Sequence, residues 1–261
     1  DLTAYALNKA QGFMEEAKKV ENKILKQAIA FSAVLTLIAV LVGWFISSSI
    51  LSNVSSLKDT MTKITTTGKL VPSDLEGNNE ITEMAEHFNG LIEQLKSQFW
   101  LGESRNNLNR ELSGELTYDQ ILTKSIKHVS RNVDACAGAL YTFNAKNSVC
   151  ELKSSYAFVE RTYLANTFNL GEGIVGQVAV EKKAILLKNI VSQEAVGQSG
   201  TVSQPPTAIY AIPLLHEKTL FGVLEIASFE EITQVKQQYL NAAANIISVL
   251  LNTASQNEQI K

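Results

Sequence analysis

The sequence has little cysteine, little charge and no excess of positive charge, and each shortage excludes a class of protein. Its 2 cysteines, Cys136 and Cys150, are not spaced as a CxxC motif, and they are too few for the disulfide framework of a small secreted domain. A formal net charge of −3 provides no basic surface, whereas nucleic-acid binding needs cationic side chains to neutralise phosphates. The composition therefore argues against a disulfide scaffold, a thiolate metal site and a nucleic-acid partner.

Catalytic motifs are also absent from the sequence. It contains no P-loop, no HEXXH metalloprotease sequence, no GxSxG nucleophile elbow, no kinase loops and no GGDEF-like run. We therefore expect this chain not to be an enzyme, and we identify no cofactor or metal for it. Because the sequence starts at Asp1 and stops within a helical pattern, we expect a longer protein with an output module beyond Lys261.

Charged residues make up only 19% of the chain, and one uncharged segment, residues 28–46, accounts for much of that shortage. As a helix this segment would span roughly 28 Å at about 1.5 Å per residue, close to the hydrocarbon core of a bilayer. Trp44 suits the membrane interface at one end, and Lys26 can extend its amine to the headgroups at the other. We predict a transmembrane helix over residues 27–50, preceded at residues 1–26 by the end of an external or juxtamembrane helix. The alternative is a buried core helix, although core helices are rarely apolar over this length.

Two amphipathic segments follow the predicted span, and a connector with Gly68, Pro72 and Gly77 separates them. Apolar residues recur in both segments at steps of three and four, as in the heptads of coiled coils. The connector, residues 65–79, is long enough to run back along the first helix, so that the two helices lie parallel. We predict that two chains combine these helices in a four-helix bundle whose seam consists of Val54, Leu57, Met61, Ile64, Ile81, Met84, Phe88, Leu91 and Leu95.

Residues 47–97 resemble a HAMP domain. The matching residues are Gly68, Lys69 and Leu70 in the connector, Glu80 and Ile81 at the start of the second helix, and Phe88 and Asn89 within it. Asn53 stands where the family usually has proline, which puts the usual entry kink in doubt. The resemblance implies a dimeric relay that switches between two packings of similar energy. A coiled-coil linker is expected over residues 98–114.

The orientation of the span follows from this resemblance and not from charge. More lysines precede the span than follow it, so the positive-inside rule alone would place the N-terminus in the cytoplasm. We expect the opposite, because an earlier span of a longer receptor would set the topology and the HAMP-like part resembles a cytoplasmic relay. The predicted location is the bacterial inner membrane, with a single span in this chain and the parts after it in the cytoplasm.

From Leu116 the pattern changes to alternating strands bounded by turns. After a helix that starts at Tyr118, we predict strands at 137–143, 149–156 and 163–169, a short helix at 174–180, a strand at 184–187, a polar loop at 189–207, strands at 208–215 and 220–228, and a last helix from Glu230. This order predicts an α+β domain with a mainly antiparallel sheet and its helices on one side. The fold class of the whole chain is thus multi-part: an all-α membrane helix and relay, then an α+β domain.

Residues 170–190 and 208–228 resemble the two most characteristic stretches of a GAF domain. The matching glycines are Gly171, Gly173, Gly176 and Gly222. The resemblance implies a GAF-like core over residues 115–229 and a C-terminal signalling helix over residues 230–261. In that helix, a heptad pattern predicts contact across a dimer through Ile232, Val235, Tyr239, Ala242, Ile246, Val249 and Thr253.

Related GAF domains bind cyclic nucleotides, tetrapyrroles or small aromatic molecules, and many bind nothing. The candidate pocket residues here are Tyr141, Tyr156, Ile174, Val175, Ile190, Tyr210 and Ile212, with a core role as the alternative for each. The cyclic-nucleotide signature is missing, and neither cysteine occupies the bilin-attachment region. His128 and His216 are better explained as surface residues than as haem ligands. A small-molecule ligand and a purely dimerising role both stay open.

These segments together predict transmembrane signal transduction by a homodimer that contacts the lipid bilayer and a downstream module or response regulator. The order of HAMP-like and GAF-like parts resembles that of sensor histidine kinases of two-component systems, which implies such an output. The alternatives are a GAF sensor tethered to the membrane, a chemoreceptor, a cyclic-dinucleotide synthase or a phosphatase.

Overall fold

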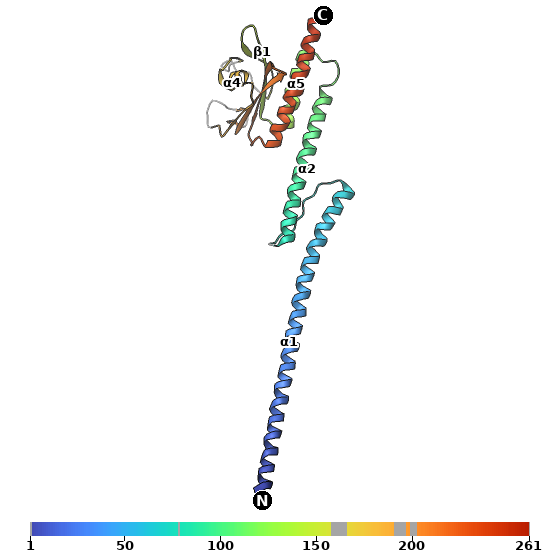
Figure 1. Ribbon diagram of the computed structural model, residues 1–261. Coiled ribbons are helices and arrows are strands. Elements are labelled where there is room, and N and C mark those ends of the chain that lie inside the picture. Colours follow the sequence, from blue (N-terminus) through green and yellow to red (C-terminus); the bar gives the residue numbers. More distant parts are fainter. Residues whose placement is uncertain (1, 78, 158–165, 191–196, 199–202, 261) are drawn as a thin grey trace. The chain divides into compact units, whose positions relative to one another are not determined.

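The computed structural model describes residues 2–77, 79–157, 166–190, 197–198 and 203–260, which form two compact units (Figure 1). The first unit, Asp1–Leu95, contains helix α1 (Leu2–Thr67), a connector and the start of helix α2 (Glu80–Glu111). The second unit, Lys96–Lys261, contains the rest of α2 and the α+β domain. One continuous helix, α2, therefore passes from the first unit into the second.

Helix α1 has 66 residues and includes the predicted span. It is long and apolar enough to cross a membrane, and none of its apolar window is buried by the rest of the chain. The expected division into a juxtamembrane helix, a span and a relay helix does not interrupt the backbone. The helix continues through Asn53, because asparagine keeps the backbone N–H that proline would remove.

The connector between α1 and α2 has defined ends. Gly68, with a φ of 68°, terminates α1 and donates its N–H to the Ile64 carbonyl at 2.8 Å. Asn79 caps α2, since its Oδ1 accepts from the N–H groups of Ile81 at 3.1 Å and Thr82 at 3.0 Å. Figure 1 shows the chain turning back after α1, so that α2 starts out in the same direction as α1.

The second unit is built on a six-stranded antiparallel sheet with the strand order β3-β2-β1-β8-β7-β4. Its strands are β1 (Ala137–Asn144), β2 (Val149–Tyr156), β3 (Thr167–Asn169), β4 (Ile185–Lys188), β7 (Ala208–His216) and β8 (Thr219–Ser228). A separate small pair, β5 (Gly197–Gln198) and β6 (Ser203–Gln204), interrupts the predicted polar loop. The predicted α+β class and antiparallel sheet are confirmed. Part of the predicted third strand, residues 163–165, lies outside the described residues.

Helices cover both faces of this sheet, so the prediction that they lie on one side is wrong. Helices α3 (Tyr118–Asn132) and α5 (Gln234–Ile260) pack on one face, over a core that includes Leu140, Leu224 and Ile226. Helix α4 (Gly173–Glu181) packs on the other face, over Tyr141 and Val223 (Figure 1). Neighbouring residues of a strand point to opposite faces, and apolar residues occupy both positions in these strands. The central strands therefore need cover on both sides.

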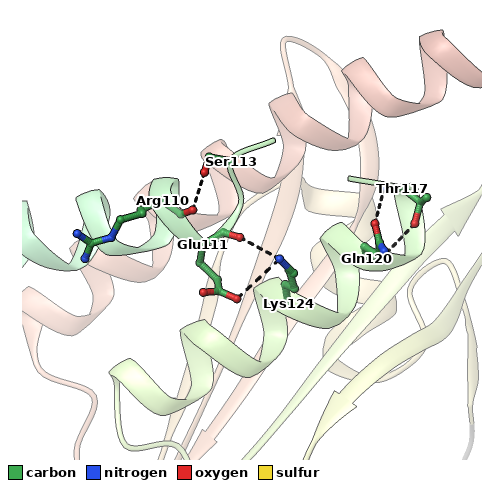
Figure 2. Close-up of polar contacts among 6 residues, drawn as sticks. All are labelled: Arg110, Glu111, Ser113, Thr117, Gln120 and Lys124. Carbon is green, nitrogen blue, oxygen red and sulfur yellow. Dashed lines mark hydrogen bonds and ion pairs between the residues drawn. The ribbon is translucent and has the colours of Figure 1, made fainter. Parts of the chain in front are cut away.

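The helix termini of the second unit follow local signals. Thr117 and Gln120 form a capping box at the start of α3, which Figure 2 shows as reciprocal side-chain to backbone contacts. Helix α5 begins at Gln234 and not at Glu230, because the Thr233 hydroxyl accepts from the third N–H after it at 3.4 Å.

The face of α5 that contacts the domain differs from the predicted dimer seam. Tyr239 is fully buried in the domain's own core and makes an edge-to-face contact with Trp100 of α2, with ring centroids 5.6 Å apart. Ile232 is also in this core. The predicted seam is therefore wrong at these two residues, since neither side chain is free to contact a second chain.

Candidate functional site

The clearest polar feature inside the second unit is a carboxylate on the α4 side of the sheet. Glu225 lies in the middle of β8, at the same strand parity as Val223, whose side chain packs under α4. Its direct neighbours in register are Ala139 on β1 and Ala211 on β7. Because both neighbours have only a methyl group, the carboxylate is not enclosed by large side chains from the adjacent strands.

Tyr141 supplies the hydrogen bond that holds this carboxylate. Its hydroxyl donates to Glu225 Oε2 at 3.2 Å, across the β1–β8 pairing. The ring of Tyr141 is itself held by an edge-to-face contact with Phe168 of β3, with centroids 5.5 Å apart. Glu225 has no Lys, Arg or His partner among the residues that the structure describes.

Burial controls the ionisation of these groups. Loss of solvent raises the pKa of Glu225 above its usual range, and the Tyr141 hydrogen bond opposes that rise. Burial and the nearby Glu225 charge both raise the pKa of Tyr141, so this hydroxyl keeps its proton and stays a donor. Burial also raises the pKa of the Cys150 thiol, in the same apolar cluster, to about 11. The site thus contains one group that can carry charge near neutral pH, Glu225.

The fold and this site can now be compared with known proteins. A family model described as GAF domain matches residues 115–252. The chain belongs to the GAF domain family. This is a family of ligand-binding signalling and sensor domains. No curated protein matches the chain.

Solved GAF domains share the fold of this one. The GAF domain from an Acinetobacter phosphoenolpyruvate-protein phosphotransferase is 14% identical with a TM-score of 0.52, covering 61% of this chain and 97% of that one. The corresponding domain of a Coxiella burnetii phosphoenolpyruvate-protein phosphotransferase is 15% identical with a TM-score of 0.52, covering 61% and 96%. At these identities the likeness concerns the fold alone.

The residues predicted to line a GAF pocket do not lie together. Tyr141, Ile174 and Val175 belong to the cluster on the α4 side, whereas Tyr210 and Ile212 belong to the core under α3 and α5. Tyr210 is held there by Asn241 of α5, whose Nδ2 donates to the Tyr210 hydroxyl at 2.9 Å.

The last two predicted residues also lie apart from the α4 cluster. Tyr156 packs against the core under α3 and α5, and Ile190 is half-buried after the end of β4. A single pocket lined by all seven predicted residues is therefore wrong. The prediction selected large apolar residues near the motifs without following which face of each strand they occupy.

The sequence analysis overlooked Glu225. A single acidic residue stands inside the otherwise apolar stretch LFGVLEIAS of β8. Charged residues are rarely placed in the middle of a central strand unless they are paired or functional. That isolated charge, combined with its parity to Val223, was the available signal.

A second polar surface lies where α2 meets α3. Lys124 Nζ donates to the Glu111 carbonyl at 3.5 Å and lies 4.0 Å from its carboxylate, as Figure 2 shows. These two residues border a groove of about 550 Å³ whose other lining residues are Thr123, Lys127, His128, Arg131 and Asn132. Burial lowers the pKa of His128, although Glu111 opposes this shift. Because Lys127 and Arg131 are exposed, this surface has the character of a solvated helix face.

Metal binding finds no support in the described part of the chain, where no three His, Cys, Asp or Glu residues gather around one point. Cys136 and Cys150 are both free thiols. His216 lies at the end of β7, next to the turn into β8.

In the first unit, the predicted relay residues divide by exposure. Leu57 is buried, and Ile64, Ile81 and Phe88 are half-buried. The exposed members of the set are Val54, Met61, Met84, Leu91 and Leu95. The prediction missed Ala85 and Ile92, which are the most buried apolar residues of this part of α2.

A side-chain clamp joins the connector to α2 within the first unit. Asn89 Oδ1 accepts from the Ser73 N–H at 2.7 Å, and Asn89 Nδ2 donates to the Ser73 carbonyl at 2.9 Å. A single amide side chain thus satisfies both backbone groups of a connector residue. This pairing fixes the connector against α2 at one point.

Proposed function

We propose that this chain is the membrane-anchored relay and sensory part of a dimeric bacterial signal-transducing receptor. The observation that carries the proposal is helical continuity: the uncharged segment 28–46 lies in a helix that runs unbroken to Thr67, and α2 runs unbroken into the GAF unit. A helix transmits axial shifts and rotations along its length, because each turn is hydrogen-bonded to the next. A displacement in the membrane can therefore reach Trp100, which contacts Tyr239 in the GAF core.

The proposed relay is HAMP-like and works as a homodimer. The apolar residues that a single chain leaves exposed along the two seams, such as Met84 and Leu91, would be covered by a second copy in a parallel four-helix bundle. The Ser73–Asn89 clamp supports this arrangement, because it holds the connector along α2 and leaves the seam face uncovered. Signalling would consist of a change between two packings of this bundle.

The proposed chemistry of this part of the protein is transmission and not catalysis. The output is proposed to be a histidine kinase module after Lys261, acting on a response regulator. The reading frame beyond Lys261 tests this point: a phospho-acceptor histidine followed by a glycine-rich ATP-binding region is expected. A chemoreceptor tip or a cyclic-dinucleotide synthase in that position would replace the kinase and leave the relay unchanged.

Disulfide crosslinking in native membranes tests the dimer. In a Cys136→Ser, Cys150→Ser background, Met84→Cys is expected to form a disulfide-linked dimer rapidly on mild oxidation. Glu86→Cys is the matched control, because residue 86 is exposed but lies about 200° around the helix from residue 84. Equal crosslinking of both variants, or none with Met84→Cys, would contradict the bundle.

A reporter fusion tests the membrane topology. Alkaline phosphatase fused after Ser97 should be inactive, and a cytoplasmic reporter at the same position should be active. High phosphatase activity there would place the GAF domain outside the cytoplasm and overturn the proposed orientation.

A second candidate function is a small-molecule sensor in which the span serves only as an anchor. The partly buried Glu225 on the α4 side of the sheet favours it, since a carboxylate without a cationic partner is costly in a purely structural core. The two candidates are compatible, because a ligand on the GAF domain can change the same helical packing that the membrane helix changes.

A further inference from the structure

We infer that the α4-side face of the GAF domain binds a small organic cation, with a protonated amine paired to Glu225. This inference rests on the proposed role of the GAF domain as a ligand sensor and adds the chemical class of the ligand. It is carried by the position of the carboxylate, the small residues beside it and the partners that it lacks within the described chain.

The first argument is hydrogen-bonding capacity. An ionised carboxylate accepts about four hydrogen bonds, whereas Glu225 receives only one described side-chain hydrogen bond, from the Tyr141 hydroxyl. A protonated amine has three donors, so it can satisfy the Glu225 oxygens and still bond to the Tyr141 oxygen. Pairing with an amine also offsets the cost of keeping the charge away from water.

The second argument is space and shape. Ala139 and Ala211 flank Glu225 on the two adjacent strands, so the surface beside the carboxylate is low on both sides. Phe168 and Tyr141 place aromatic rings near the same end of the group, and such rings favour cations. A short alkylammonium fits this combination of a carboxylate, small neighbours and aromatic rings.

The third argument is exclusion of other ligands. A phosphate or carboxylate ligand placed about 4 Å from Glu225 would be repelled by about 4 kcal/mol at an effective dielectric constant of 20. No Lys or Arg on the described part of this face compensates for that repulsion. Anionic nucleotides are therefore disfavoured here, and neutral ligands gain nothing from the charge.

The test uses three soluble probes of matched length that differ in charge: 4-aminobutan-1-ol, butane-1,4-diol and 4-hydroxybutyrate. Binding to the full chain in detergent micelles is measured by isothermal titration calorimetry. We expect the amine to bind about tenfold or more tightly than the diol, and the acid to bind weakest. Glu225→Gln should reduce amine binding to the level of the diol, while the fluorescence of Trp100 verifies that the variant is folded.

Two further variants make the result specific. Glu151→Gln removes a carboxylate on neighbouring β2 that is already paired with Lys153 at 2.9 Å, so amine binding should stay unchanged. Tyr141→Phe removes only the hydroxyl and keeps the charge, so amine binding should fall by a few-fold at most. Unchanged amine binding in Glu225→Gln, or no saturable amine binding to the native chain, overturns the inference.

The outcomes also separate this inference from the proposed function. Tight, saturable binding of the diol or the acid would overturn the cationic class and leave the GAF domain a ligand sensor. Failure of the crosslinking and fusion experiments would overturn the membrane relay without any change in amine binding.

Discussion

Residues 28–46 and the strands of the GAF domain are both rich in Leu, Ile and Val, yet their side chains lie in opposite environments. In α1, Leu37 is 63% exposed, whereas Leu224 of β8 is 0% exposed. The GAF strands find cover inside the chain because helices pack on both faces of the sheet. Helix α1 is apolar on all sides, and such a helix needs cover from a lipid bilayer or another chain. The comparison teaches that similar composition requires different partners when the apolar residues are distributed differently.

The largest expected effect breaks the buried side of this comparison. Leu224→Ala should lower the free energy of unfolding of the GAF domain by about 2–5 kcal/mol, because it removes buried methyl groups and leaves a cavity. Chemical denaturation followed by Trp100 fluorescence, in a Trp44→Phe background, measures this change. Leu37→Ala is the matched control and should leave the same transition within about 0.5 kcal/mol. A similar loss in both variants would contradict the separation of the two regions.

The next effect concerns two glycines in these regions. A Cβ at Gly222 would lie 1.9 Å from the Tyr141 carbonyl oxygen, so Gly222→Ala should destabilise the GAF domain by about 2–4 kcal/mol. A Cβ at Gly102, in the exposed face of α2, meets nothing within 4 Å. Gly102→Ala should therefore stabilise by about 0.5–1 kcal/mol, because alanine favours the helix. Thermal unfolding of both variants measures the signs, and equal signs would disagree with the structure.

A smaller effect compares the caps of the two units. Thr117→Ala removes the hydroxyl of the α3 capping box and should cost about 1 kcal/mol in GAF unfolding (Figure 2). Asn79→Ala removes the α2 cap in the first unit and should leave the GAF transition unchanged. Amide hydrogen exchange should increase in the first turn of α3 in one variant and of α2 in the other. Increased exchange at both sites in either variant would mean that the two units do not respond separately.

The smallest effect is the pH dependence that Glu225 produces. Its folded pKa is raised, so its contribution to stability is fully present below the unfolded pKa and is lost as pH rises through the folded pKa. Glu225→Gln should therefore be more stable than the native chain near pH 8, by on the order of 1 kcal/mol, and should approach it near pH 4. Tyr141 and Cys150, with raised pKa values, stay neutral over this range and do not contribute. Unfolding free energies at several pH values measure the difference, and a constant difference would exclude Glu225 as its source.

Much of the second unit could be predicted from its sequence. The strand pattern at 137–143, 149–156, 208–215 and 220–228 agrees with the observed strands within one or two residues, because turns and alternation are local signals. The site could not be predicted in the same way. Tyr141 and Tyr210 look equivalent in the sequence, but they lie on opposite faces of the sheet, and only strand register shows which side each one occupies.

The sequence by itself determined the apolar helix of membrane length, the division into a helical part and an α+β part, and the resemblance to the GAF family. These depend on composition and on periodicities of a few residues, which operate before the chain is packed. Only the tertiary structure decided that α4 covers the second face of the sheet, that Tyr239 belongs to the domain core and that Tyr141 donates to Glu225. The hydrogen bond joins residues 84 positions apart in the chain, and such contacts are set by sheet register and helix packing, which no local pattern encodes.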